Sequence, residues 1–248
     1  MGKLLEVSGL FKKYDDKTDY TIKDINIYGD AGEIVGLLGH NGAGKSTTIK
    51  CLTGIHPYNK GKIKIADHDL KKSPLKAKAS FGFVSDNYAL LEKMTGLEYI
   101  NFMADVYQVS DEDRKARIDY FQEIFALGEA INRQIASYSH GMKQKVSIMA
   151  ALIHNPKVFI LDEPMTGLDP HAANQLKNYF IDHSKNNNLV LFSSHNLDVV
   201  EKLCDRVYII DQGEILEEIN MNDFRKKGID LEEYFLSSTN KVSKWVRI

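Results

Sequence analysis

The chain has 248 residues and a formal net charge of −2 at pH 7, which allows one large core or one core with an inserted subdomain. A charge this close to neutral, in a chain whose basic residues are mostly lysine, argues against nucleic acid as a main partner. The two cysteines, Cys51 and Cys204, lie far apart without metal-ligand spacing, so we expect a reduced, cytoplasmic protein.

Short strands are expected in the first part of the chain. Residues 4–7 and 20–27 alternate between apolar and polar side chains, and a Gly29-Asp30 turn follows the second run. Residues 61–66 alternate in the same way. Together these runs predict an antiparallel sheet that flanks the rest of the core.

A glycine-rich loop lies between these strands. It completes the phosphate-loop pattern G-x-x-x-x-G-K-[ST] with Gly39, His40, Asn41, Gly42, Ala43, Gly44, Lys45, Ser46 and Thr47. An apolar strand-like run precedes it and a helical run follows, so backbone N–H groups and a helix N-terminus can both face a phosphate. Lys45 can reach the β- and γ-phosphates, and the Ser46 hydroxyl can bind Mg²⁺. A merely structural turn is disfavoured because both residues are in register, and we expect a nucleoside triphosphate to bind.

The middle of the chain changes character. Residues 98–106, 111–125 and 142–153 carry helical spacing, while strand signals disappear, which predicts a helical subdomain over about residues 87–155. Just before it lies a group of lysines that we interpret as a solvated face, with contact to lipid headgroups as the alternative: Lys71, Lys72, Lys76 and Lys78.

The core resumes after the helical segment. Residues 158–161 and 189–192 are continuous apolar runs typical of buried parallel strands, with a crossover helix expected over 170–185. Residues 206–216 indicate a strand, a glycine turn and a second strand, and 231–236 an amphipathic C-terminal helix.

We therefore predict an α/β fold: a P-loop NTPase core with a mostly parallel sheet, a flanking antiparallel β subdomain and an inserted helical subdomain. The chain is expected to be a single domain, in which 1–86 and 156–220 form the core and 221–248 form a C-terminal helix and tail. For the last residues, from 241 onward, a loose tail and a small contact site both remain open.

A pair of carboxylates follows the apolar run 158–161. Asp162 ends a predicted buried strand, where a carboxylate can hold Mg²⁺ directly or through water. Glu163, one residue on, points differently and can orient an attacking water. An Asp-Glu pair alone is common, but its place downstream of a phosphate loop favours a catalytic function.

Residues 138–145 read Tyr-Ser-His-Gly-Met-Lys-Gln-Lys, and here the chain resembles the ATP-binding cassette (ABC) family, whose diagnostic sequence is L-S-G-G-Q before a helix. The resemblance covers nearly the whole chain, with Walker A at 39–47 and Walker B at Asp162 and Glu163. It adds further motifs in the family's order: Tyr14 as the aromatic that stacks on adenine, Gly167-Leu168-Asp169 as the D-loop, and His195 as the switch histidine.

The resemblance implies ATP and Mg²⁺ as cofactors and ATP hydrolysis as the activity. It also implies a head-to-tail dimer with a second cassette, in which Ser139 and Gly141 place a hydroxyl and an N–H on the γ-phosphate held by the opposite subunit. His195 would sense that phosphate, and Asp169 would lie at the same interface. An integral membrane permease would dock on the helical subdomain and the loop near Asp86.

Three departures from the family pattern stand out. Tyr138 replaces the usual leucine of the signature, and His140 adds bulk where glycine is usual. Asp86 occupies the position of the Q-loop glutamine. A shorter carboxylate there could reach Mg²⁺, through water if not directly, and the alternative is that Asp86 only caps the helical subdomain.

The signature ending, Asp86 and the run 231–236 resemble export-type ABC ATPases that are encoded apart from their permeases and handle drugs, antimicrobial peptides or polysaccharides. This implies a location at the cytoplasmic face of the membrane, held there by the permease, because no apolar run approaches the length of a membrane span. The alternatives are an importer ATPase and a soluble ABC ATPase that acts on ribosomes or DNA. A single cassette without a long coiled coil disfavours the latter.

Overall fold

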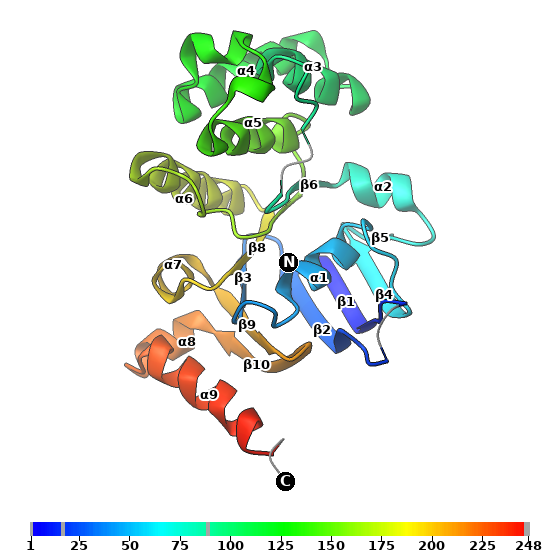
Figure 1. The fold of residues 1–248 in the computed structure, drawn as a ribbon, viewed down its shortest axis with the longest axis vertical. Coiled ribbons are helices and arrows are strands. Elements are labelled where there is room, and N and C mark those ends of the chain that lie inside the picture. Colours follow the sequence, from blue (N-terminus) through cyan, green and yellow to red (C-terminus); the bar gives the residue numbers. More distant parts are fainter. Residues whose placement is uncertain (1, 16–17, 88–89, 246–248) are drawn as a thin grey trace.

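The computed structural model describes residues 2–15, 18–87 and 90–245, with side chains described up to residue 239. Two sheets form the centre of the molecule (Figure 1). The smaller sheet is antiparallel and has the order β2-β1-β4-β5. Its strands are β1 (Lys3–Lys12), β2 (Ile22–Asp30), β4 (Lys60–Ile65) and β5 (His68–Asp69).

The larger sheet has the order β10-β9-β3-β8-β7-β6, and every neighbouring pair is parallel except β9 and β10. Its strands are β3 (Ile34–Leu38), β6 (Phe81–Val84), β7 (Val158–Leu161), β8 (Leu189–Ser194), β9 (Arg206–Asp211) and β10 (Glu214–Asn220). In β3, β7 and β8 every residue is buried, because both faces of the sheet are covered.

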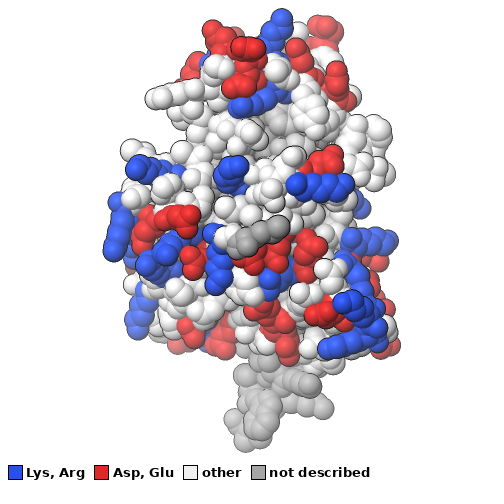
Figure 2. Space-filling model, turned by 180° about the vertical axis from the view of Figure 1, so that it is seen from behind, with Lys and Arg blue, Asp and Glu red and all other residues white. Residues whose placement is uncertain are grey.

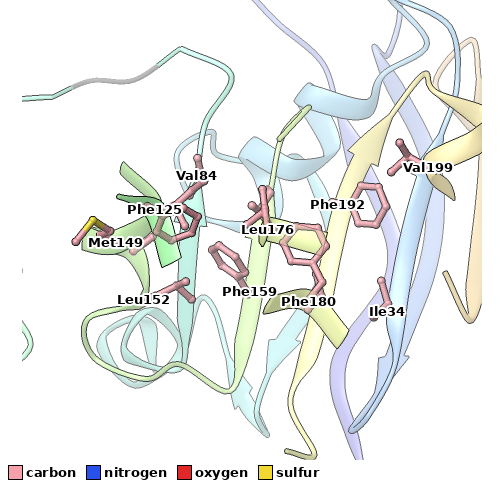
Figure 3. Close-up of a cluster of buried hydrophobic side chains, with 14 of the residues drawn as sticks. Ile34, Val84, Phe125, Met149, Leu152, Phe159, Leu176, Phe180, Phe192 and Val199 are labelled. Atoms are coloured by element: carbon pink, nitrogen blue, oxygen red, sulfur yellow. The ribbon is translucent and has the colours of Figure 1, made fainter. Parts of the chain in front are cut away.

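Alternate residues of these strands pack into two separate apolar clusters. Ile34 and Phe159 face a cluster shared with the helices, whereas Val35 and Val158 face a cluster shared with the antiparallel sheet. In the first cluster the rings of Phe159 and Phe180 meet edge to face with centroids 6.0 Å apart (Figure 3). This two-sided packing holds the carboxyl ends of the parallel strands at one edge, where the site lies.

Helices cover the central sheet and extend beyond it. They are α1 (Lys45–Leu52), α2 (Pro74–Ala79), α3 (Gly96–Val106), α4 (Asp111–Phe125), α5 (His140–Leu152), α6 (Pro170–Lys185), α7 (Leu197–Leu203), α8 (Met221–Lys226) and α9 (Leu231–Trp245). The helices α3, α4 and α5 lie together at one end of the molecule, and α8 and α9 lie at the other (Figure 1).

Acidic and basic side chains are interspersed over the face shown in Figure 2. No helix of the described residues has the length and apolar character needed to cross a membrane. Both cysteines are buried thiols, and burial raises the pKa of Cys51 to about 11.

The predicted sheets and the predicted helices at 111–125 and 170–185 are present in the structure. The prediction missed the short elements α2, β6, α7 and α8, which carry too few residues to show a periodic pattern. It also started the signature helix too late, because α5 begins at His140. The division of the chain into subdomains stays a prediction.

Candidate active site

The phosphate loop connects β3 to α1, as the sequence predicted. Gly44 takes φ +111° at the N-cap of α1, a conformation that favours glycine. A Cβ at Gly39 would lie 2.4 Å from the backbone oxygen of Ile210, so only glycine fits against β9 there. The loop is therefore held close to the central sheet, with the N-terminus of α1 directed at the space above it.

Lys45 is buried beneath this loop, with 5% of its surface exposed. Its Nζ donates hydrogen bonds to the backbone oxygens of Gly39 (2.7 Å) and His40 (3.2 Å). The same ammonium lies 3.3 Å from Oε1 of Glu163. A single cation thus joins the phosphate loop to the second carboxylate after β7.

Asp162 is 1% exposed at the end of β7. The Ser193 hydroxyl donates a 2.6 Å hydrogen bond to its Oδ1, while its buried Oδ2 has no hydrogen-bond partner among the described residues. Burial raises the pKa of Asp162; hydrogen bonds from Ser193 and Ser46 oppose this, and the charge of Asp86 adds to it. The Oδ2 of this buried carboxylate is therefore available to bind a cation.

Glu163 points in a different direction from Asp162, as expected. Its φ of +50° turns the backbone sharply after the strand, and its N–H donates to the Ser193 oxygen at 2.9 Å. Its Oε2 lies 2.9 Å from Nδ1 of His195, at the end of β8. Glu163 therefore stands between the cation of Lys45 and an exposed imidazole, an arrangement that can hold and orient a water.

A cavity of about 390 Å³ opens above these groups. It is lined by the predicted Tyr14, His40, Asn41, Gly42, Gly44, Lys45, Ser46, Thr47, Asp86 and Glu163, and by Thr21, which the sequence analysis missed. No motif marks Thr21, which lies directly before β2. The predicted Gly39, Ala43, Asp162 and His195 do not line the cavity themselves. Gly39 and His195 contact its lining residues Lys45 and Glu163.

Asp86 lines the cavity and follows the end of β6. It accepts a 2.9 Å hydrogen bond from the Ser85 hydroxyl, and Lys50 of α1 lies 3.9 Å away. The idea that Asp86 only caps the helical segment is wrong. The cap of α3 is Thr95, which forms a capping box with Glu98.

The signature residues lie apart from this cavity. Ser139 caps α5 by accepting a hydrogen bond from the N–H of Met142. Lys145 of α5 lies 3.6 Å from Asp169, which caps α6. Ser139, Gly141 and Asp169 therefore form a second group of predicted site residues that this chain's own cavity does not use.

The ring of His140 packs against Gly167 in the D-loop of the same chain. A Cβ placed on Gly167 would meet the His140 ring at 2.2 Å, and one placed on Gly141 would lie 3.1 Å from the Gly167 oxygen. The side chain of Gln144 also donates to the backbone oxygen of Pro164. The start of α5 is therefore packed against the segment that follows Walker B.

The sequence profile of the family described as ABC transporter matches residues 22–166, which is more than half of the chain. This chain belongs to the ABC transporter family. It is the ATP-binding subunit of an ABC transporter, and cassettes of this family are ATPases. The resemblance drawn from the sequence, the α/β fold and the ATPase activity are thereby confirmed.

Named relatives cover most of the chain. The linearmycin resistance ATP-binding protein LnrL of Bacillus subtilis is 36% identical over 86% of this chain and 68% of its own length. The bacitracin transport ATP-binding protein BcrA of Bacillus licheniformis is 32% identical over 98% of this chain and 78% of its own. A solved structure titled as the ATP-binding subunit of an ABC transporter superposes with a TM-score of 0.89 at 32% identity, covering 95% and 99% of the two chains.

Proposed function

We propose that this ABC ATPase powers the export of a drug, an antimicrobial peptide or similar cargo through a separate membrane permease at the cytoplasmic face of the membrane. The similarity to the bacitracin transport protein BcrA, which extends over 98% of this chain, carries the proposal. The linearmycin resistance protein LnrL supports it. The methionine import protein MetN of Clostridioides difficile, 30% identical over 91% of this chain, keeps import as the second candidate.

Within the site, we assign ATP to the cavity above the phosphate loop. Tyr14 would stack on adenine, and the loop N–H groups and Lys45 would bind the phosphates. To receive the γ-phosphate, the Lys45 ammonium would exchange its 3.3 Å contact with Glu163 for phosphate oxygens.

Mg²⁺ fits the residues beside this cavity. The buried Oδ2 of Asp162 has no hydrogen-bond partner among the described residues, and the Ser46 hydroxyl lies within hydrogen-bond reach of the same carboxylate. Ser46 and Asp162 would hold the ion, with Asp86 directly or through water. When bound, the metal neutralises charge on the phosphates.

We assign water activation to Glu163. Its carboxylate is 19% exposed, less solvated than a surface acid, and after Lys45 turns to the phosphate it keeps its contact with His195. A carboxylate fixed in this way can accept the proton of a water aligned with the γ-phosphate. His195, at 2.9 Å from Oε2, would hold that carboxylate and contact the phosphate.

The second group of site residues supports a head-to-tail dimer of cassettes. Ser139 lies at the N-terminus of the 13-residue helix α5, where a phosphate is electrostatically favoured. In the proposed dimer, Ser139 and Gly141 face the nucleotide of the other copy, and Asp169 lies at the same interface.

The permease would dock in a groove of about 480 Å³ beside Asp86. It lies between the core and the helical segment and is lined by Lys50, Ile55, His56, Phe83, Ser85, Asn87, Leu90, Tyr99 and Ser147. Ile55 is 53% exposed there and offers an apolar contact to a partner. A partner in this groove would sense Asp86, and through it the nucleotide.

The test is to express the chain with the membrane protein encoded beside it in a bacitracin-sensitive Bacillus host. We expect the inhibitory concentration of bacitracin or linearmycin to rise severalfold, and the Glu163→Gln variant to abolish the increase. The chain should be recovered with membranes only when the permease is present. If the chain restores growth on limiting methionine and confers no resistance, import rather than export is its function.

A further inference from the structure

The C-terminal helix α9 is firmly packed on the core. Asp230 caps it by accepting hydrogen bonds from the N–H groups of Glu232 (2.8 Å) and Glu233 (3.0 Å). Leu231 and Phe235, one turn apart on the same face, are 0% and 4% exposed. This face joins the apolar cluster of the central sheet, so the position of α9 is well defined relative to the strands.

One of these anchors touches the nucleotide site. The Phe235 ring lies with its centroid 4.8 Å from that of His40, at an interplanar angle of 55°. His40 is the second residue of the phosphate loop and lines the nucleotide cavity. A residue near the end of the chain is thus in ring contact with the loop that is to hold the phosphates.

The backbone of His40 is a junction within that loop. Its carbonyl oxygen accepts hydrogen bonds from the N–H of Ala43 and from Nζ of Lys45, both at 3.2 Å. A shift of His40 therefore moves the turn at 40–43 and changes the surroundings of the lysine. Fixing the imidazole ring fixes the geometry of the phosphate loop.

The first turn of α9 also lies close to His195, the predicted switch histidine, and to the start of α7. A cavity of about 360 Å³ is lined by Asp230 and Glu232 on one side and by His195 and the start of α7 on the other. The helix therefore lies beside two parts of the nucleotide machinery, although none of its residues up to 239, where side chains are described, lines the nucleotide cavity.

We propose that Phe235 is a positioning residue for ATP binding, acting through its ring contact with His40. The inference goes beyond the family assignment and does not depend on the cargo. Two rings in contact stabilise a structure by more than the burial of their apolar surface alone. We therefore expect loss of this pair to weaken ATP binding about 2- to 12-fold. The turnover number should change little, because Glu163 and His195 keep their contacts.

The test uses the purified full chain and a fluorescent ATP analogue. Phe235→Leu keeps apolar volume but removes the ring, and Phe235→Tyr keeps the ring as the rescue variant. Phe224→Leu is the matched control, because Phe224 is 6% exposed in the same cluster but packs its ring on Tyr234 at 5.3 Å. The dissociation constant, KM, kcat and Tm are measured for each.

We expect Phe235→Leu to raise the dissociation constant and KM by the stated factor with kcat nearly unchanged. Phe235→Tyr should restore both, and Phe224→Leu should lower Tm without changing either. Combining Phe235→Leu with His40→Ala should add nothing to the effect of His40→Ala alone.

Two results would overturn the proposal. One is equal weakening of ATP binding by Phe224→Leu and Phe235→Leu, which would assign the effect to general loss of stability. The other is unchanged ATP affinity in His40→Ala. That variant changes an exposed side chain and tests the contact even if Phe235→Leu fails to fold.

Discussion

At the scale of single residues, Glu163 combines a left-handed backbone with two charged or polar contacts. Its carboxylate lies between Lys45 and His195, so its removal changes the charge of the site without removing an apolar contact. We expect Glu163→Gln to retain ATP binding and to lose hydrolysis, because an amide cannot accept the proton of the attacking water. ATP should then trap a dimer, detectable by gel filtration. Hydrolysis at the parental rate would show that another group activates the water.

The burial of Asp162 suits metal binding but destabilises the folded protein when the carboxylate is ionised. Burial is the main cause of its raised pKa, so the folded state holds the proton more tightly than the unfolded state does. Stability linked to this group is therefore present at low pH and is lost as pH rises through its folded pKa. We expect Asp162→Asn to raise Tm at pH 7 and to abolish Mg²⁺-dependent turnover. The gain in Tm should shrink in melts at lower pH; a constant or negative difference would contradict this account.

Asp86 is a short carboxylate where the family has a longer amide. If it reaches Mg²⁺ or the attacking water, Asp86→Gln should retain a substantial part of the activity. Asp86→Ala should lose hydrolysis while leaving Mg²⁺-free nucleotide binding nearly intact. Turnover is titrated against Mg²⁺ in both variants, alongside thermal melts. An unshifted Mg²⁺ midpoint together with a lowered Tm in Asp86→Ala would leave Asp86 only a structural role.

At the scale of helices and strands, His154 ties the end of α5 to its neighbours. Its ring stacks on Tyr107 at 3.7 Å, and Nε2 lies 3.2 Å from the backbone oxygen of Phe81 in β6. Burial lowers the pKa of His154 to about 4. The neutral ring therefore contributes stability that is present above its unfolded pKa, about 6.5, and is lost as pH falls toward 4.

We expect the free energy of unfolding to decrease between pH 6.5 and 4, with His154 responsible for about 3 kcal/mol of the loss. His154→Phe keeps a ring against Tyr107 but cannot bind a proton, so it should flatten this part of the profile. Urea titrations at several pH values measure the slope. A profile of equal steepness in both proteins would assign the loss to other groups, such as the buried His183.

At this scale, features formed by residues close together in the sequence could be predicted, whereas contacts between residues far apart in the sequence could not. The phosphate loop is a local pattern, and Asp162 was recognisable because four apolar residues place it at the end of a buried strand. By contrast, Phe235 meets His40 across almost the whole chain, and no local pattern marks such a contact. The direction of the His140 ring also needed the structure, because it depends on the D-loop glycine at 167.

At the scale of the whole molecule, the two sheets are joined by Arg206. This side chain is 9% exposed at the start of β9, in the central sheet. Its guanidinium lies 2.8 Å from Glu33, contacts Glu218 of β10, and donates a 2.7 Å hydrogen bond to the Tyr28 hydroxyl of β2, in the antiparallel sheet. The planar fork of arginine suits such a junction, because several N–H donors point outward in one plane.

Arg206→Leu would keep apolar contact with Tyr28 but leave Glu33 and Glu218 without their cation. We expect the free energy of unfolding to fall by about 2–4 kcal/mol, because an acid left partly buried without its partner is costly. The matched control is Lys64→Leu, which breaks an exposed ion pair with Glu6 in the antiparallel sheet and should cost under about 1 kcal/mol. Urea unfolding followed by circular dichroism measures both variants. If Arg206 couples the sheets, the parent protein should unfold in one cooperative transition, and Arg206→Leu should unfold over a broader range of urea. A single sharp transition with parental stability in Arg206→Leu would show that apolar packing between the sheets is sufficient to hold them together.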